Sequence, residues 1–234
     1  MDTRSLQKYV AVQNIAKETI QFLKSFIREG VTEREIKEAA EKFMFEKGVH
    51  SFWYHDIGTF VFVGERTLLS QSGKIYSPTE TKIQKNDLIT VDLSPEKDGI
   101  LGDHARSFLV ENGIVVNPEK STQKEIQEGI GVEEKLHALF RENIRKDISF
   151  EEAFLQMNFF IEGFGYTNLD FRNNIGHSIP EEKEKTLFIE SGNRTTFREV
   201  KLFTFEPHIQ KKNGKYGFKR EDIYFFKNGI LNVL

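Results

Sequence analysis

Two acidic pairs are the residues of this chain whose types and spacing are best suited to chemistry. Asp92 lies in LITVDL and Glu206 lies in LFTFEP, and the neighbouring residues in each case favour a buried strand. A second acid follows each of them, Asp103 in the first segment and Glu221 in the second. A carboxylate that faces a protein core is costly unless it is paired or binds a metal ion. If the four acids meet, a pair of divalent cations would remove their mutual repulsion.

For either strand acid taken alone, a buried salt bridge or a position at a strand end is the more common explanation. The two segments can, however, be aligned with each other, so that position 92 corresponds to 206 and position 103 to 221. In both cases the offset is an even number of residues. Side chains of a strand alternate between its faces with a period of two. The alignment therefore predicts that the acids share one face of two related hairpins.

His177, in NNIGHSIP, is the candidate nitrogen ligand of the same site. A neutral imidazole is a common metal ligand, although a lone histidine is more often structural. Gly176 beside it has no side chain, so it lets the backbone approach its neighbours closely. One imidazole with mostly carboxylate ligands suits Mn²⁺ or Fe²⁺ and also permits Co²⁺ or Zn²⁺.

The elements that must position these residues follow a repeated order of two helices and then strands. Capping-box motifs at Thr32 and Ser149 indicate where two of the helices begin. We expect Gly129 and Gly131 to loosen the third helix. Apolar spacing predicts helices at 5–29, 32–48, 122–144 and 149–162, and strands at 59–63, 88–93, 105–110, 200–205, 223–226 and 230–234.

The repeated order indicates a weak internal duplication. Asn112-Gly113 in the first half matches Asn228-Gly229 in the second, and this dipeptide favours the tight turns of β-hairpins. No linker rich in Pro, Gly or Ser separates the halves, so we expect a single domain over residues 1–234. The predicted fold class is α/β in the broad sense (α+β), with antiparallel strands and flanking helices.

Composition excludes several classes of function. The chain has no cysteine, which rules out disulfides, thiolate zinc sites and cysteine nucleophiles. A formal net charge of -3 and the lack of a basic cluster argue against a nucleic-acid partner. The polar N-terminal residues MDTRSLQKYVAVQ lack the core of a signal peptide, and no apolar run reaches the roughly 18 residues of a membrane-spanning helix. We therefore expect a soluble, cytoplasmic protein that engages no membrane.

Five short motifs in a fixed order make the chain resemble the pita-bread metallopeptidase family, which includes methionine aminopeptidase, aminopeptidase P and prolidase. The motifs, each of which holds one of the acids or the histidine, are VDLS, GDHAR, GHSI, TFEP and EDIY. Each motif is weak alone, but their order from Asp92 onward is specific. The resemblance implies a pita-bread fold of two pseudo-symmetric halves, in which antiparallel strands curve around a two-metal centre.

On this resemblance, Asp103 and Glu221 would bridge two divalent metal ions, with Mn²⁺ as the first choice. Asp92 would hold one ion, and His177 and Glu206 would hold the other. Glu206 would also carry a proton from the attacking water to the departing amine. The implied activity is that of a metallo-aminopeptidase that hydrolyses an N-terminal peptide bond, with Xaa-Pro peptides of the aminopeptidase P branch as the favoured substrates. A homodimer is a further possibility.

The histidines that usually surround the substrate in this family are missing. The stretch IYSPT has no histidine where HYxPT is usual, and Asn173-Asn174 precede the GHSI motif. His104 and His208 follow ligands closely in the chain, so they are either catalytic replacements or supports for the ligands. His55, in FWYHDIG, is a candidate to line the substrate pocket.

Two further functions stay open at this point. The chain could bind metal and recognise a peptide or partner without hydrolysing it, which the missing histidines favour and the complete ligand set opposes. A creatinase-like hydrolase that works without metal is a weaker alternative, because it would depend on histidines that this chain lacks. Metal content compared with peptide turnover separates the first alternative from a peptidase.

Overall fold

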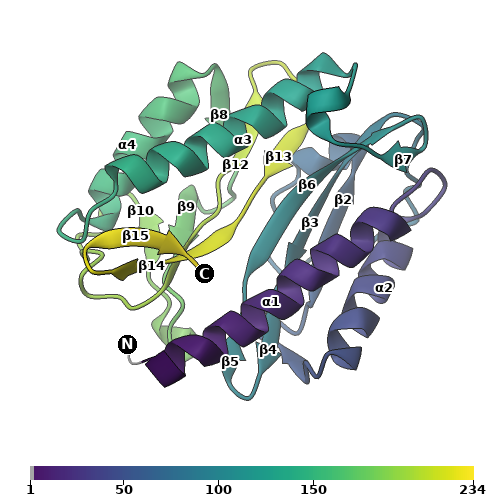
Figure 1. The fold of residues 1–234 in the computed structure, drawn as a ribbon. Helices are drawn as coiled ribbons and strands as arrows, with labels where there is room; N and C mark the ends of the chain where they lie inside the picture. Colours follow the sequence, from purple (N-terminus) through teal and green to yellow (C-terminus); the bar gives the residue numbers. More distant parts are fainter. Residues whose placement is uncertain (1–2) are drawn as a thin grey trace.

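The computed structural model describes residues 3–234, and its first half joins two helices to antiparallel strands (Figure 1). Helices α1 (Thr3–Phe26) and α2 (Glu33–Glu46) come first. A small sheet places β4 (Pro95–Lys97) between β1 (Ser51–Phe52) and β5 (Ile100–Leu101). The main sheet has the order β2-β3-β6-β7, and the bounds of its strands are Thr59–Val63, Asp87–Leu93, His104–Glu111 and Ile114–Val115.

The second half repeats this order, with helices α3 (Lys124–Asn143) and α4 (Phe150–Gly163) ahead of its strands. Strands β11, β14 and β15 form an antiparallel sheet, β9 pairs with β10, and β12 lies between β8 and β13. The bounds of β8 to β15, in chain order, are Tyr166–Asn168, Asn174–His177, Phe188–Glu190, Phe203–Phe205, His208–Lys211, Gly217–Lys219, Asp222–Lys227 and Ile230–Val233. The mixed helical and antiparallel architecture expected from the sequence is confirmed.

The two predicted capping boxes are present and explain where α2 and α4 begin. The Thr32 hydroxyl accepts a hydrogen bond from the Glu35 backbone N–H at 3.2 Å, and the Glu35 carboxylate accepts one from the Thr32 N–H at 2.8 Å. Ser149 and Glu152 repeat the pair at 3.2 and 2.8 Å. Each box satisfies backbone donors that the first helical turn leaves without partners.

Both Asn-Gly dipeptides form the predicted hairpin turns. Asn112 and Gly113 have φ values of 55° and 84°, and Asn228 and Gly229 have values of 52° and 79°. Consecutive positive φ values match the right-handed twist of the paired strands, and Asn and Gly adopt them at low cost. The turns join β6 to β7 and β14 to β15, so the two halves end in the same local structure.

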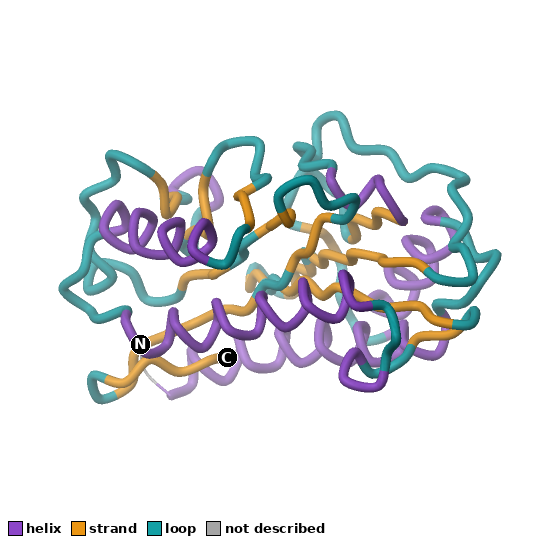
Figure 2. The backbone as a smooth tube through the Cα atoms, turned by 90° about the horizontal axis from the view of Figure 1, so that it is seen from above, coloured by secondary structure: helices purple, strands orange, loops and turns teal. Residues whose placement is uncertain are grey.

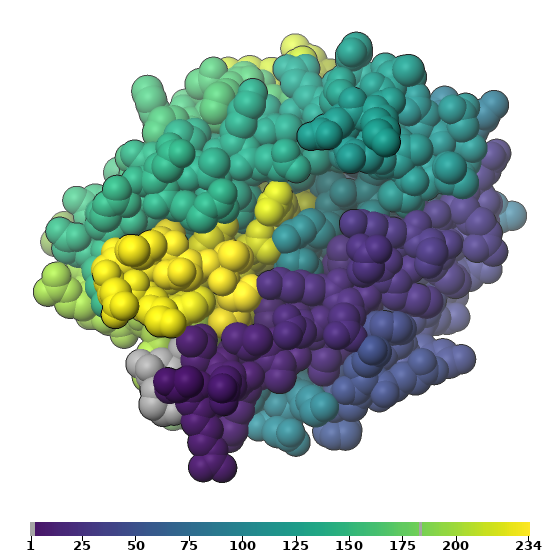
Figure 3. Space-filling model, in the orientation of Figure 1, coloured from purple at the N-terminus to yellow at the C-terminus, as the bar shows by residue number. Residues whose placement is uncertain are grey.

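An apolar core lies beneath the helices of each half, and the core of the second half also includes Leu88 and Leu109 of the first. In the first half, α1 and α2 pack on β2, β3 and β6 through residues such as Leu23, Ile36 and Val91. In the second half, α3 and α4 cover a core rich in aromatic rings, where Phe140 stacks on Phe205 with ring centroids 4.1 Å apart. Figure 2 shows α1 and α3 along the same side of the strands, and Figure 3 shows the C-terminal strands filling the surface between them.

The two halves are joined through the start of β6 and the start of β14. The Glu221 N–H donates to the Ala105 carbonyl at 3.0 Å. The Arg106 guanidinium also crosses the junction, donating to the Glu221 carbonyl at 2.7 Å and to the Asp222 carboxylate at 2.6 Å. Because Asp103 and Glu221 border these segments, the junction brings an acid of each half to the same place.

Two expectations for the second half need correction. The strand expected at 200–205 covers only Phe203–Phe205. Before it the chain turns at residues 197–198, where the Phe197 and Arg198 N–H groups donate to the carbonyls of Ile148 and Lys146. Helix α3 is continuous across Gly129 and Gly131 rather than loosened by them. A Cβ on Gly129 would lie 2.2 Å from the Phe218 ring, so this glycine is a packing site.

Within residues 3–234, none of the helices combines the length and apolar character of a membrane-spanning segment.

Glu133 of α3 is a buried acid outside the acidic site. It is 2% exposed, and its Oε1 has no hydrogen-bond partner among residues 3–234. Burial raises the pKa of this carboxyl from 4.5 to about 8, although Arg220 and Arg106 lower it. The folded protein therefore holds a proton that the unfolded chain releases. This contribution to stability is complete below pH 4.5 and is lost as the pH rises towards about 8.

We expect the free energy of unfolding to fall between about pH 5 and about pH 8, by up to about 1.4 kcal/mol per pH unit where only Glu133 titrates. Glu133→Gln cannot ionise and should flatten this slope. Urea unfolding at several pH values measures the effect, and the same change at exposed Glu134 is the matched control. An unaltered slope in Glu133→Gln would show that the carboxyl is ionised throughout this range.

Candidate metal centre

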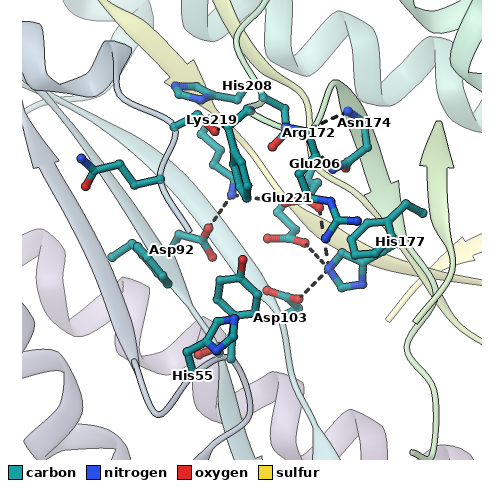
Figure 4. A pocket seen from close by; sticks show the side chains of 18 of the residues that line it. His55, Asp92, Asp103, Arg172, Asn174, His177, Glu206, His208, Lys219 and Glu221 are labelled. Carbon is teal, nitrogen blue, oxygen red and sulfur yellow. Dashed lines mark hydrogen bonds and ion pairs between the residues drawn. The ribbon is translucent and has the colours of Figure 1, made fainter. Parts of the chain in front are cut away.

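The five residues predicted as metal ligands line one cavity of about 510 Å³, to which both halves contribute (Figure 4). Asp92 lies in β3, and Asp103 lies directly before β6. His177 ends β9, Glu206 follows β11 and Glu221 precedes β14. The ends of strands from two halves therefore meet at one place, as the sequence pattern predicts.

Asp103, His177 and Glu221 form the closest group. Each of them offers one ligand atom, and these atoms lie within 4.8 Å of one another. The His177 Nε2 is 3.3 Å from Asp103 Oδ2 and 4.0 Å from Glu221 Oε1. Glu206 approaches from the same side, with its Oε1 3.7 Å from His177 Nε2. The group is therefore one imidazole facing three carboxylates.

The hydrogen bond on the far side of the His177 ring selects its tautomer. The Nδ1 lies 2.9 Å from the Ser178 carbonyl oxygen, which can only accept, so Nδ1 carries the proton and donates. The Nε2 lone pair is then directed at the carboxylates. A neutral imidazole with a free Nε2 is the form that binds a metal ion.

The carboxylates are crowded and buried. Burial raises the pKa of Asp103 well above its usual value, and the charges of Asp92 and Glu206 raise it further. The pKa of Glu221 is likewise raised well above normal, first by burial and then by Asp103. Its buried Oε1 finds no hydrogen-bond partner in the described part of the chain. A divalent cation fits this donor set, because it would give that oxygen a partner and offset the repulsion.

Gly176 allows β9 to approach β11 closely enough to place His177. Its φ is +152°, and a Cβ at this position would lie 2.3 Å from the Thr204 carbonyl oxygen. The Thr204 hydroxyl accepts a hydrogen bond from the His177 N–H at 3.0 Å. The close backbone approach expected of Gly176 is therefore present.

Sequence analysis did not identify Gln13, which positions Asp103 from helix α1. The Gln13 side chain accepts from the Asp103 N–H at 3.1 Å and donates to the Asp103 carbonyl at 2.6 Å. It is 1% exposed. An amide among Val12, Ile15 and Ala16 on the buried face of α1 was a signal that could have identified it.

A match to the family model for metallopeptidase family M24 spans residues 7–228, nearly the whole chain. The chain belongs to this family. Among solved structures, the X-Pro aminopeptidase of Thermotoga maritima MSB8 has a TM-score of 0.81 at 18% identity, over 100% of this chain and 61% of that one. The prolidase of Pyrococcus horikoshii OT3 has a TM-score of 0.82 at 19% identity, over 99% and 62%.

The methionine aminopeptidase of Rickettsia prowazekii, another solved structure, has a TM-score of 0.72 at 17% identity, over 100% of this chain and 97% of that one. No curated protein matches the chain by sequence. At these identities the similarities establish the fold, and the pita-bread fold expected from the sequence is confirmed. The M24 chain spans less than two thirds of the aminopeptidase and the prolidase.

The three histidines that the sequence offered as further site candidates in this M24 protein occupy different places. His55 and His208 line the cavity. The His208 Nε2 donates to the Thr67 carbonyl at 2.7 Å, and burial lowers the pKa of this imidazole to about 4, so it is neutral at pH 7. His104 is not among the cavity-lining residues described; its Nδ1 is 3.4 Å from the Asp222 carboxylate. His104 thus occupies the supporting position that was the alternative to a catalytic one.

The structure aligns the two halves differently from the sequence comparison, by two residues at Glu206. Asp92 pairs with Ala105 in the first sheet, whereas Phe205 pairs with Asp222 in the second. Continuing each register places Ser94, and not Asp92, in the position that corresponds to Glu206. A shift of two residues keeps the same face of a strand, so the prediction that the acids converge survives this error.

Lys219 is the second residue that sequence analysis did not identify. It belongs to β13, and its ammonium bonds to Asp92 Oδ2 and lies 3.2 Å from Glu206 Oε2 (Figure 4). Burial alone would lower the pKa of Lys219, but the charges of Asp92 and Glu206 raise it well above its usual value. Its place two residues before Glu221, on the same face of an extended segment, was the available signal.

The rest of the M24 cavity is mainly aromatic on one side. Trp53 packs edge-on against the His177 ring at 5.5 Å, and its indole N–H donates to the Gly102 carbonyl at 2.9 Å. Arg172 lies over the Phe188 ring, with its guanidinium carbon 3.9 Å from the ring centroid. The cavity thus joins an acidic, metal-suited end to an apolar wall on which Arg172 adds a positive charge.

Proposed function

We propose that this M24 metallopeptidase is a metal-dependent aminopeptidase that hydrolyses the N-terminal bond of a peptide. The observation that carries the proposal is the grouping of Asp103, His177 and Glu221, with Glu206 3.7 Å from the His177 Nε2, at the end of a cavity large enough for a short peptide. The uncompensated Glu221 oxygen supports a cation in this position. Mn²⁺ is the cation we favour, because oxygen donors predominate.

When bound, a divalent cation acidifies a water molecule and polarises the carbonyl of the bond to be cleaved. His177, with its Nδ1 proton donated to Ser178, keeps its Nε2 available as a ligand. Glu206 borders both this group and the open cavity, and burial raises the pKa of its carboxyl. A carboxyl with a raised pKa is suited to accept a proton from water and to deliver it to the departing amine.

Peptides with proline in the second position are the substrates we propose. Phe60, Phe62 and Trp53 on the cavity wall offer faces on which a proline ring can pack. The acidic end of the cavity favours a free α-amino group near the scissile bond. Two metal ions, a homodimer and a cytoplasmic location remain predictions from the sequence, as does a single domain over residues 1–234.

The activity is tested by incubating the purified chain with a library of short peptides in Mn²⁺, Fe²⁺, Co²⁺ or Zn²⁺. We expect release of the N-terminal residue, faster from Xaa-Pro peptides, and no release from the same peptides with an acetylated N-terminus. Mass spectrometry of the products measures both. Metal binding without cleavage of any peptide would contradict the proposal and favour the alternative, a metal-binding protein that recognises peptides.

A further inference from the structure

Lys219 is held firmly beside the candidate metal centre. Its backbone N–H donates to the Ser107 hydroxyl at 2.9 Å, and that hydroxyl donates in turn to the Lys219 carbonyl at 3.1 Å. Lys219 also pairs with His208 across β12 and β13. These contacts fix the start of the side chain, so the ammonium reaches the cavity from a defined position on the strand.

The Lys219 ammonium occupies the space between two of the predicted ligands. It bonds to Asp92 on one side and lies 3.2 Å from Glu206 on the other. Both contacts are ion pairs between an ammonium and a carboxylate. Asp92 therefore already has a cationic partner supplied by the chain itself.

Asp92 also stands apart from the closest ligand group. In the structure of residues 3–234, the group whose ligand atoms lie within 4.8 Å of one another is Asp103, His177 and Glu221. It includes neither Asp92 nor Glu206, but Glu206 Oε1 lies 3.7 Å from His177 Nε2. Glu206 has one oxygen towards His177 and the other towards Lys219. Glu206 thus divides the site into a part suited to a metal ion and a part held by the ammonium.

We propose that the Lys219 ammonium takes the place of a second metal ion, so that this site binds one divalent cation through Asp103, His177, Glu206 and Glu221. The proposal rests on the proposed function for the site and replaces the expectation of two ions. A divalent cation on Asp92 would lie within a few ångströms of the ammonium, where like charges repel strongly in a partly buried site. One divalent ion and one ammonium together offset most of the charge of the four carboxylates.

The test is a count of bound metal. The wild-type chain, Lys219→Gln and Lys219→Ala are titrated with Mn²⁺ by calorimetry and analysed for metal after dialysis. Electron paramagnetic resonance separates an isolated Mn²⁺ from a spin-coupled pair. Lys219→Gln keeps a hydrogen-bond donor towards Asp92 without the charge, which guards against misfolding of the alanine variant. Exposed Lys212→Ala is the matched control.

We expect one tightly bound Mn²⁺ with an isolated signal in the wild type and in Lys212→Ala. Both Lys219 variants should bind a second ion at least about tenfold more tightly than the wild type does and should give a coupled signal. Two tight ions in the wild type, or a single ion in both folded Lys219 variants, would overturn the proposal. One bound ion without peptide cleavage would contradict only the proposed function, whereas two ions with cleavage would contradict only the role of Lys219.

Discussion

Asp103→Asn is expected to remove tight metal binding and to lower kcat/KM for peptide cleavage by at least about 10³-fold. Asp103 supplies a buried oxygen 3.3 Å from the His177 Nε2, and an amide in its place is a much weaker ligand for a cation. A bound metal ion contributes several kcal/mol to catalysis, and each 1.36 kcal/mol is a factor of ten in rate. Calorimetry with Mn²⁺ and a peptide-cleavage assay measure the two losses.

The matched control for this change is Asp98→Asn. Asp98 is exposed in the turn between β4 and β5 and has a φ of 53°, which asparagine also adopts readily. Metal binding and kcat/KM should equal those of the wild type. Retention of tight Mn²⁺ binding by Asp103→Asn would show that Asp103 is not a ligand and would remove the basis of the proposed function.

The stability of metal-free Asp103→Asn distinguishes lost function from lost folding. Burial and neighbouring acids raise the pKa of Asp103, so the ionised carboxylate is unfavourable in the folded, metal-free protein. A neutral amide removes this repulsion. The free energy of unfolding in the presence of a chelator should therefore be at least that of the wild type, as measured by urea denaturation. A large decrease would mean that Asp103 is mainly a structural residue.

Gly176→Ala is expected to destabilise the protein by about 2 to 4 kcal/mol and to weaken metal binding by about 10- to 100-fold. The new Cβ would meet the Thr204 backbone oxygen at 2.3 Å, and backbone cannot give way as a flexible side chain can. The φ of +152° adds strain for any residue with a Cβ. Relief requires β9 to move away from β11, which displaces His177 from the carboxylates.

Gly131→Ala is the matched control for that substitution. Gly131 lies inside helix α3. Among the described residues, no heavy atom that could obstruct a Cβ at this position lies within 4 Å of it. Alanine should raise the free energy of unfolding by up to about 1 kcal/mol, because it favours the helix over glycine. Equal effects of the two substitutions on thermal unfolding and on Mn²⁺ affinity would show that the β9–β11 contact does not position His177.

Much of the secondary structure was predictable because its causes are local. The capping boxes at Thr32 and Ser149 and the hairpin turns at Asn112 and Asn228 depend on residues within three or four positions of one another. The strand at 59–63 has the bounds that its apolar pattern indicates. The strand expected at 200–205 was too long at its start. The chain just before it is held in a turn at residues 197–198 by backbone hydrogen bonds to residues 146–148, far away in the chain.

The convergence of the five candidate ligands on one cavity was predictable, but their arrangement within it was not. The order of five motifs and the alternation of strand side chains were enough to bring Asp92, Asp103, His177, Glu206 and Glu221 to one cavity. The same alternation tolerated an alignment error of two residues between the halves. The alternation of side chains contained no information on which of the five candidate ligands lie closest together.

What the sequence determined by itself is therefore the set of elements and the face of each that carries an acid, because periodicity and short-range hydrogen bonds decide both. The tertiary structure alone decided which side chain of a distant element meets which acid. Gln13 reaches Asp103 across 90 residues, and Lys219 reaches Asp92 across 127. Such contacts depend on how the helices and the two halves pack together, and no local pattern of residues specifies that packing.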